Sequence, residues 1–260
     1  MHLPIHDTAL DPQAQRILDR RRLRHALNAS LAFVLLLVAV FSAQGHFDVG
    51  AWAVTPGTLD GLRGLLLAPL LHGSLEHLGA NAVSLLLLGI LAGTVYPRAT
   101  LRALPLLWLG SGVGAWLLGD PGTHHLGASG LTHGLMFLVF TLGLLRRDRP
   151  AIAAAMIAFF LYGGMLLTVL PQEPGVSWQS HLGGALAGIV AAFLFRRRDP
   201  LPPRKRYSWE LEEELADENV RAQHEQFEPP SPREVPVLWQ RVPEERGVVL
   251  PFSPRRPDEP

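Results

Sequence analysis

The sequence predicts an all-α membrane protein with six transmembrane helices and a soluble tail. Six stretches come close to the roughly 20 mostly apolar residues that a spanning helix needs. Charge is segregated, because 23 of the 46 charged residues follow Arg198. The predicted spans are residues 26–43, 75–95, 101–118, 126–145, 151–170 and 178–195. We therefore divide the chain into a cytoplasmic segment 1–25, a membrane domain 26–198 and a cytoplasmic tail 199–260.

The first span could be confused with a secretory signal peptide, since a basic region precedes it. The polar leader is long, however, and the sequence Phe41-Ser42-Ala43-Gln44 is a poor match to a small-x-small cleavage site. We expect the segment to be retained as a transmembrane helix.

Composition excludes several classes of function. The chain has no cysteine, which rules out disulfides, cysteine-based zinc sites and thiol catalysis. The net charge of zero averages two unlike regions and gives no indication of a nucleic-acid partner. After Arg198 the chain has 12 of its 22 prolines, with 14 acidic and 9 basic residues. There we expect one charged helix over 207–227 and disorder in the rest.

Arginines predict the orientation of the bundle. Short cytoplasmic loops hold the Lys/Arg excess, and here arginines alternate with the spans. Arg63 is the single arginine in the other three loops, so both termini should be cytoplasmic. One lysine beside 22 arginines is codon usage typical of a GC-rich bacterial genome, so we expect a bacterial cytoplasmic membrane. The arginines that flank the spans are Arg20, Arg21, Arg22, Arg24, Arg98, Arg102, Arg146, Arg147, Arg149, Arg196, Arg197 and Arg198.

The first outer loop, residues 46–70, is long and partly apolar. It contains Trp52, Pro56, Gly57 and an apolar run over 65–71. This composition predicts a partly embedded or interfacial loop, with Trp52 as an anchor at the membrane surface.

Polar side chains begin three of the spans, all at the predicted extracytoplasmic end. His72, His77 and Asn81 lie at the start of the second span, Ser129 at the start of the fourth, and His181 at the start of the sixth. Such groups are costly inside a bilayer, so they indicate a functional site.

Ser129 and His181 have the chemistry of a nucleophile and its base. Serine needs a base and oxyanion donors to react, and the N-terminus of a helix supplies free N–H groups. Leu131 stands where a nucleophile elbow would have its second glycine, so an α/β-hydrolase is not supported. Alone, Gly-Ala-Ser-Gly is more often a helix cap.

Small residues would let the fourth and sixth spans approach closely enough for these two side chains to meet. They are Gly127, Gly130 and Gly134 on the fourth span and Gly184 and Gly188 on the sixth.

His77 and Asn81 are four residues apart and so share one face of a helix. Both can donate hydrogen bonds to an oxyanion. His72 lies about 140° around the helix from His77 at 100° per residue. We expect His72 at the junction of loop and helix, holding the loop in place.

Together these residues resemble the rhomboid family of intramembrane serine proteases over residues 71–195. The matching pieces are His72-x4-His77-x3-Asn81, Gly127-x-Ser129-Gly130 and His181-x2-Gly184-x3-Gly188. The resemblance implies a six-helix rhomboid bundle with a Ser129–His181 dyad. It also implies oxyanion stabilisation by His77, Asn81 and the Ser129 N–H. No cofactor is implied, and the expected substrates are single-span membrane proteins cut in or beside their spans through an acyl-enzyme.

The sequence departs from the family pattern in two places. His133 stands four residues after the serine, where the family usually has a tyrosine packed on the catalytic histidine. The family's Trp-Arg pair in the first outer loop is also missing, which affects the loop and substrate entry more than the chemistry.

Three other functions are compatible with parts of this pattern. The six histidines of the outer half could hold a metal, but no His-Glu-x-x-His occurs. A transporter would show paired carboxylates or broken helices at mid-membrane. A catalytically silent relative that binds membrane clients is the more serious rival, but it would have lost the serine or the histidine. An active protease is therefore the preferred interpretation.

Overall fold

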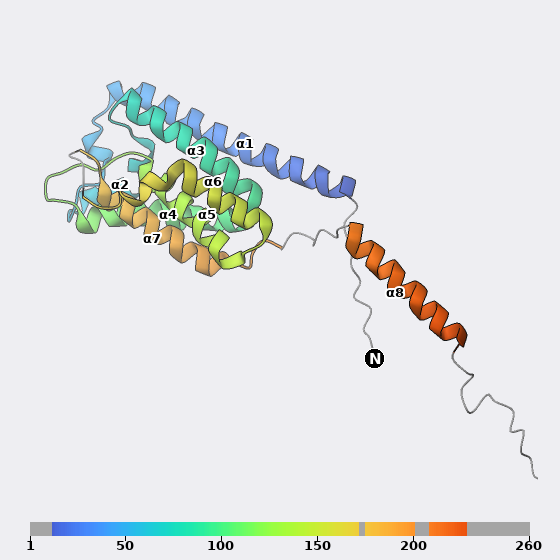
Figure 1. Cartoon of the computed structure of the whole chain (residues 1–260). Helices are drawn as coiled ribbons and strands as arrows, with labels where there is room; N and C mark the ends of the chain where they lie inside the picture. The colour runs from blue at the N-terminus through green and yellow to red at the C-terminus, as the bar shows by residue number, and fades with distance from the viewer. Residues whose placement is uncertain (1–11, 172–174, 201–207, 228–260) are drawn as a thin grey trace, which may run out of the picture. The chain divides into compact units, whose positions relative to one another are not determined.

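The computed structural model describes residues 12–171, 175–200 and 208–227 (Figure 1). Two compact units are present, Met1–Arg204 and Lys205–Pro260. In the second unit the described residues form one charged helix, α8 (Ser208–Phe227), as predicted for 207–227. The disorder predicted for the rest of the tail falls outside the described residues.

The described part of the first unit is all-helical and contains six helices long and apolar enough to cross a membrane. The prediction of six spans is therefore confirmed. The helices are α1 (Pro12–Ala43), α3 (Leu75–Val95), α4 (Pro97–Leu118), α5 (Ser129–Arg146), α6 (Arg149–Tyr162) and α7 (Trp178–Phe195).

Two of these helices have the predicted ends, and the others differ for local reasons. Helix α1 starts at Pro12, so no break separates the segment 1–25 from the first span. Its early part is rich in arginine, leucine and alanine, which favour helix without being apolar enough to mark a span. Helix α6 ends at Tyr162 instead of 170, where two glycines follow.

The first outer loop folds against α4 through short helical turns, one of them α2 (Gly64–Leu67). Two tryptophan side chains of α4 donate to its backbone. Trp108 Nε1 lies 3.1 Å from the Leu66 carbonyl, and Trp116 Nε1 lies 2.9 Å from the Thr58 carbonyl. Leu59 and Leu66 remain exposed on its outer side, so the loop presents apolar surface away from the helices.

Helix α7 packs between α4 and α5, and glycines make both contacts possible. A Cβ on Gly184 would collide with the Gly130 carbonyl of α5, and one on Gly188 with the Gly134 carbonyl. The two predicted small-residue strips therefore face each other. On the other side, Gly183 packs directly on Gly110 of α4, and neither glycine belongs to the predicted strips.

The end of the bundle opposite Ser129 is tied by the chain that leaves α7. The Asp199 carboxylate accepts hydrogen bonds from the Arg98 and Ala99 N–H groups, each at 2.9 Å, at the N-terminus of α4. A carboxylate is favoured there by the helix dipole. Arg146 donates to the Asp199 carbonyl at 2.9 Å and to Asp148 at 3.0 Å, which joins the end of α5 to the same cluster.

Candidate active site

Ser129 is the first residue of α5, and the turn before it is held by backbone contacts. Gly127 has φ +113°, a conformation that favours glycine, and its N–H donates to the Ala68 carbonyl at 2.9 Å. This turn explains why the helix starts at Ser129 and not at residue 126. The N–H groups of a first helical turn have no partner in the helix, so they surround the Ser129 side chain with donors.

His181, in the first turn of α7, lies within hydrogen-bonding distance of Ser129. Its Nε2 is 2.8 Å from Ser129 Oγ, and its Nδ1 is 2.9 Å from the Thr168 carbonyl. A carbonyl can only accept, so Nδ1 carries the proton and Nε2 presents its lone pair to the serine hydroxyl. Both side chains sit where α5 and α7 are in glycine contact. The structure thus places a serine hydroxyl beside an unprotonated imidazole nitrogen.

His133 stacks on His181, with ring centroids 3.9 Å apart and planes 12° from parallel. Its Nδ1 donates to the Ser129 carbonyl at 2.7 Å, and its Nε2 is 2.8 Å from Thr168 Oγ1. Both ring nitrogens are therefore engaged away from the Ser129 hydroxyl, and His133 does not compete with His181 for it. Thr168, which contacts both imidazoles, has no sequence signal of its own.

We expect His133→Tyr to keep activity within about tenfold of wild type, because an aromatic ring can preserve the stack on His181. His133→Ala should reduce kcat by about 10²-fold, since the imidazole of His181 then loses the face that fixes its position. Cleavage of a model membrane substrate in liposomes would measure both. Wild-type activity in His133→Ala would show that the stack is not needed, and an inactive, well-folded His133→Tyr would show that an aromatic ring cannot replace the hydrogen bonds of His133.

His77 and Asn81 lie on the side of Ser129 formed by α3. The His77 ring packs on Gly127, where an added Cβ would lie 2.7 Å from Nε2. Asn81 is buried one turn further along, and its Nδ2 donates to the His77 carbonyl at 2.9 Å. An amide nitrogen carries two N–H groups, so one remains for a ligand.

His72 lies in the turn before α3, with its ring fully buried edge-on against His77 at 5.1 Å between centroids. Burial, and then the neighbouring His77, lower the pKa of His72 to about 4, so it is neutral at neutral pH. The Gln44 side chain pairs with its backbone, donating to the His72 carbonyl at 2.7 Å and accepting from its N–H at 2.9 Å. Through Gln44, the end of α1 holds the turn that leads to His77.

A second histidine–serine pair connects the same two chain segments four residues earlier. His125 Nδ1 is 2.7 Å from Ser177 Oγ, and both residues precede their dyad counterparts by four positions. Thr123 donates its hydroxyl to the Asp120 carbonyl at 2.7 Å, so His125 Nε2 must donate to Thr123 Oγ1. His125 Nδ1 is therefore the unprotonated ring nitrogen, and it faces Ser177 Oγ, which also lies 2.9 Å from Ser180 Oγ.

The pair is also anchored to the first outer loop. The backbones of His125 and Val54 exchange two hydrogen bonds of 2.9 Å, forming an isolated antiparallel bridge. Burial lowers the pKa of His125, which keeps Nδ1 available as an acceptor at neutral pH. From the sequence, His125 is one of the six outer-half histidines weighed as metal ligands, and no other role is predicted for it.

We expect His125→Ala to lower kcat by about tenfold to 10²-fold with little change in melting temperature, because small displacements of reacting groups have effects of this size. Ser177→Ala removes the other partner, and the double variant should be no worse than either single variant if the two side chains act as one unit. Fully additive losses in a double-mutant cycle would contradict a shared positioning role.

Among the described residues, no three His, Asp or Glu side chains are arranged to hold a metal ion. The histidines around Ser129 are instead stacked, or bonded to backbone and hydroxyl groups. The arrangement is suited to acyl transfer by serine.

Comparison with known proteins identifies the family. Residues 59–198 match the family model described as the rhomboid domain. This chain belongs to the rhomboid family.

Several known proteins are similar in sequence to this chain. The uncharacterized proteins Rv1337 of Mycobacterium tuberculosis (strain H37Rv) and Mb1372 of Mycobacterium bovis are each 42% identical over 176 residues, covering 63% of this chain and 72% of theirs. The protein named "Putative rhomboid protein L523" of Acanthamoeba polyphaga mimivirus is 24% identical over 180 residues, covering 66% and 90%. Membership of the rhomboid family accounts for the six spans and for the order of the polar motifs.

Proposed function

We propose that this rhomboid protein is an intramembrane serine endopeptidase that cleaves single-span membrane proteins in or beside their transmembrane segments. The observation that carries the proposal is the Ser129–His181 contact of 2.8 Å, with His181 Nδ1 donating to a backbone carbonyl. That geometry leaves the Nε2 lone pair able to accept the serine proton. A relative that binds membrane clients without cleaving them would not need a base beside Ser129.

The proposed reaction follows from the positions of the groups. Ser129 Oγ attacks the scissile carbonyl while His181 Nε2 takes its proton, and the tetrahedral oxyanion forms beside the N-terminus of α5. The Ser129 N–H, the His77 ring and the second N–H of Asn81 are the donors for that oxyanion. His181 then returns the proton to the leaving amine, and water hydrolyses the acyl-enzyme in the same way.

The substrate must present an extended peptide to a site that lies at helix ends inside the bundle. A helix with small or helix-weakening residues near its outer end unwinds at lower cost than one rich in strong helix formers. Single-span proteins with such a segment are therefore the proposed substrates.

Cleavage of a panel of single-span model proteins in liposomes tests this function. Each substrate is paired with a variant whose glycine or proline near the outer end of its span is replaced by leucine. We expect wild-type enzyme to cut the first of each pair faster. Binding of substrates by folded enzyme without any cleavage would overturn the proposed activity and favour client binding.

We propose further that the Ser129 end of the bundle faces the outside of a bacterial cytoplasmic membrane. Because the natural chain has no cysteine, single cysteines report sidedness without background. Asp120→Cys, in the loop before α5, should react with a membrane-impermeant maleimide on intact cells. Arg98→Cys, at the start of α4, should react only after permeabilisation. The reverse pattern would invert the proposed topology.

A further inference from the structure

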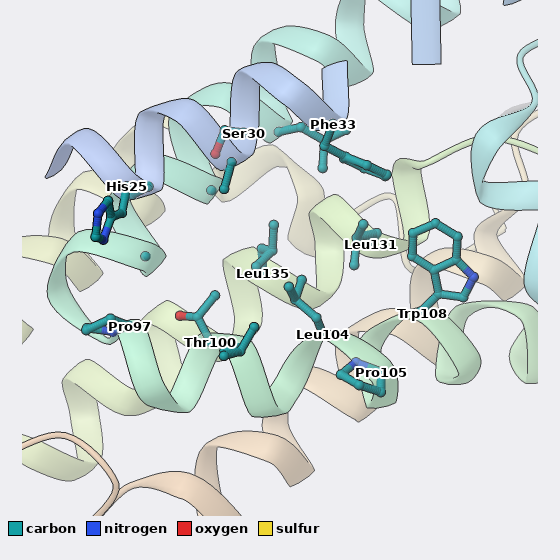
Figure 2. Close-up of a pocket in the computed structure, with 16 residues that line it drawn as sticks. His25, Ser30, Phe33, Pro97, Thr100, Leu104, Pro105, Trp108, Leu131 and Leu135 are labelled. Atoms are coloured by element: carbon teal, nitrogen blue, oxygen red, sulfur yellow. The ribbon is translucent and has the colours of Figure 1, made fainter. Parts of the chain in front are cut away.

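A cavity of about 600 Å³ lies between α1 and α4, away from the dyad (Figure 2). Helices α3 and α5 contribute to its walls, and most of its lining is aliphatic. The rings of Phe33 and Trp108, 5.8 Å apart between centroids, close one end. The other end is lined by His25, Pro97 and Thr100. Apolar cavities of this size lie within the range of binding sites for small ligands.

The second end offers polar groups that lack partners. Thr100 is 7% exposed, and its hydroxyl has no hydrogen-bond partner among the described residues. Figure 2 shows the Thr100 side chain on the α4 wall of the cavity, near Pro97. Pro105 lies within α4 and has no N–H, so the carbonyl of Leu101 loses its usual helical donor on the same wall. A ligand with hydrogen-bonding groups at one end would satisfy such atoms.

Arginines gather at this same end. Arg22 lies one turn before Ala26 on the face of α1 that lines the cavity, and Arg20, Arg21 and Arg24 are its neighbours. Arg98 and Arg102 are exposed on α4 beside the lining residues Pro97 and Leu101. Two carboxylates, Asp19 near Arg22 and Asp199 at the start of α4, offset part of this charge. The excess remains positive.

The narrow, aliphatic shape of the cavity favours one of two kinds of occupant. The cavity extends from His25 to Phe33, roughly 12 Å along α1 at 1.5 Å per residue. A transmembrane helix with its side chains is about 10–12 Å in diameter. An acyl chain is thinner and fits an aliphatic wall. Basic pockets between membrane helices are sites for anionic lipid head groups.

We propose that this cavity binds one anionic glycerophospholipid. One acyl chain lies between α1 and α4, the glycerol region meets the Thr100 hydroxyl, and the phosphate lies among the arginines of α1 and α4. The bound lipid would fill the gap between α1 and α4. This site is independent of the Ser129 chemistry.

Native mass spectrometry of the full-length protein, titrated with phosphatidylglycerol or phosphatidylcholine in detergent, tests the proposal. We expect one phosphatidylglycerol to bind more tightly than phosphatidylcholine. Ala29→Trp, which fills the cavity from an exposed position of α1, should weaken binding by about tenfold or more, since excluding two methylenes has that effect. Its matched control is Leu106→Trp, exposed on α4 but not lining the cavity.

Recognition of the lipid head group is tested with the double variant Arg22→Gln/Arg102→Gln. Both side chains are at least partly exposed. Preference for phosphatidylglycerol should fall by about fivefold per arginine. The pair Arg196→Gln/Arg197→Gln, which follows α7, should leave it unchanged. Equal binding by Ala29→Trp and Leu106→Trp, or no preference between the two lipids, would overturn the site. So would displacement of the lipid by a transmembrane peptide, since the occupant would then be a helix.

Discussion

Ser129→Ala is expected to reduce substrate cleavage by about 10⁴-fold or more, with His181→Ala close to it and the double variant no worse than either. The reason is that the two side chains act as one unit, joined by the 2.8 Å contact between Nε2 and Oγ. The variants should melt at nearly the wild-type temperature, because each removes a small group from a site held by backbone bonds. Initial rates in liposomes, with melting curves for each variant, measure this.

Ser111→Ala is the matched control for Ser129→Ala. Ser111 is buried on α4 and lies against Gly130, next to Ser129 in sequence, and it makes no hydrogen bond to a histidine of the described residues. We expect this variant to cleave at wild-type rates. Loss of activity in Ser111→Ala equal to that in Ser129→Ala, or residual cleavage by folded Ser129→Ala, would remove Ser129 from its proposed role.

Gly184→Ala is expected to be the most damaging single-methyl change in the membrane domain. The added Cβ would collide with the Gly130 carbonyl, which is rigid helix backbone, so α5 and α7 must move apart. Overpacking of this kind typically costs about 1–3 kcal/mol of stability. Because the same two helices carry Ser129 and His181, a separation of about 1 Å should also lower kcat by about 10²-fold.

Gly79→Ala provides the comparison, since a Cβ at Gly79 of α3 meets nothing within 4 Å. It should leave activity and melting temperature near wild type. Thermal unfolding in detergent and cleavage in liposomes are measured together on both variants. A Gly184→Ala protein that is as stable and as active as Gly79→Ala would contradict the close packing of α5 on α7.

Much of the fold was predictable because the hydropathy of a span, and the arginines that flank it, are properties of whole segments and not of single residues. The ends of α3 and α7 were predicted to the residue, since each helix follows a serine N-cap, Ser74 or Ser177, that precedes an apolar run. The length of helix α1 was underestimated because its first half is polar. Hydropathy marks apolar spans and does not distinguish a polar helix from a loop in water. Helix α6 ends where two glycines follow it. The apolar residues beyond these glycines are the reason why the span was predicted to continue.

The arrangement of the site was predictable only in part. The glycine strips predicted that Ser129 and His181 lie close together, because small residues let membrane helices approach each other closely. Thr168, Gln44 and Ser177 could not be found, since they act through backbone atoms or a single hydroxyl and have no distinctive spacing. His133 was recognised as a departure, but one of its two hydrogen bonds depends on the position of Thr168 in a turn after α6, and the other is made to the Ser129 carbonyl.

The most direct test of the account is labelling of the full-length protein with a fluorophosphonate, followed by peptide mapping of the adduct by mass spectrometry. We predict one adduct per chain on Ser129, strongly slowed in His181→Ala, because the reagent requires a serine oxygen whose proton is taken by a base. Folded wild-type protein that gives no adduct, or one on another serine, would contradict the assignment of Ser129 and His181 as nucleophile and base.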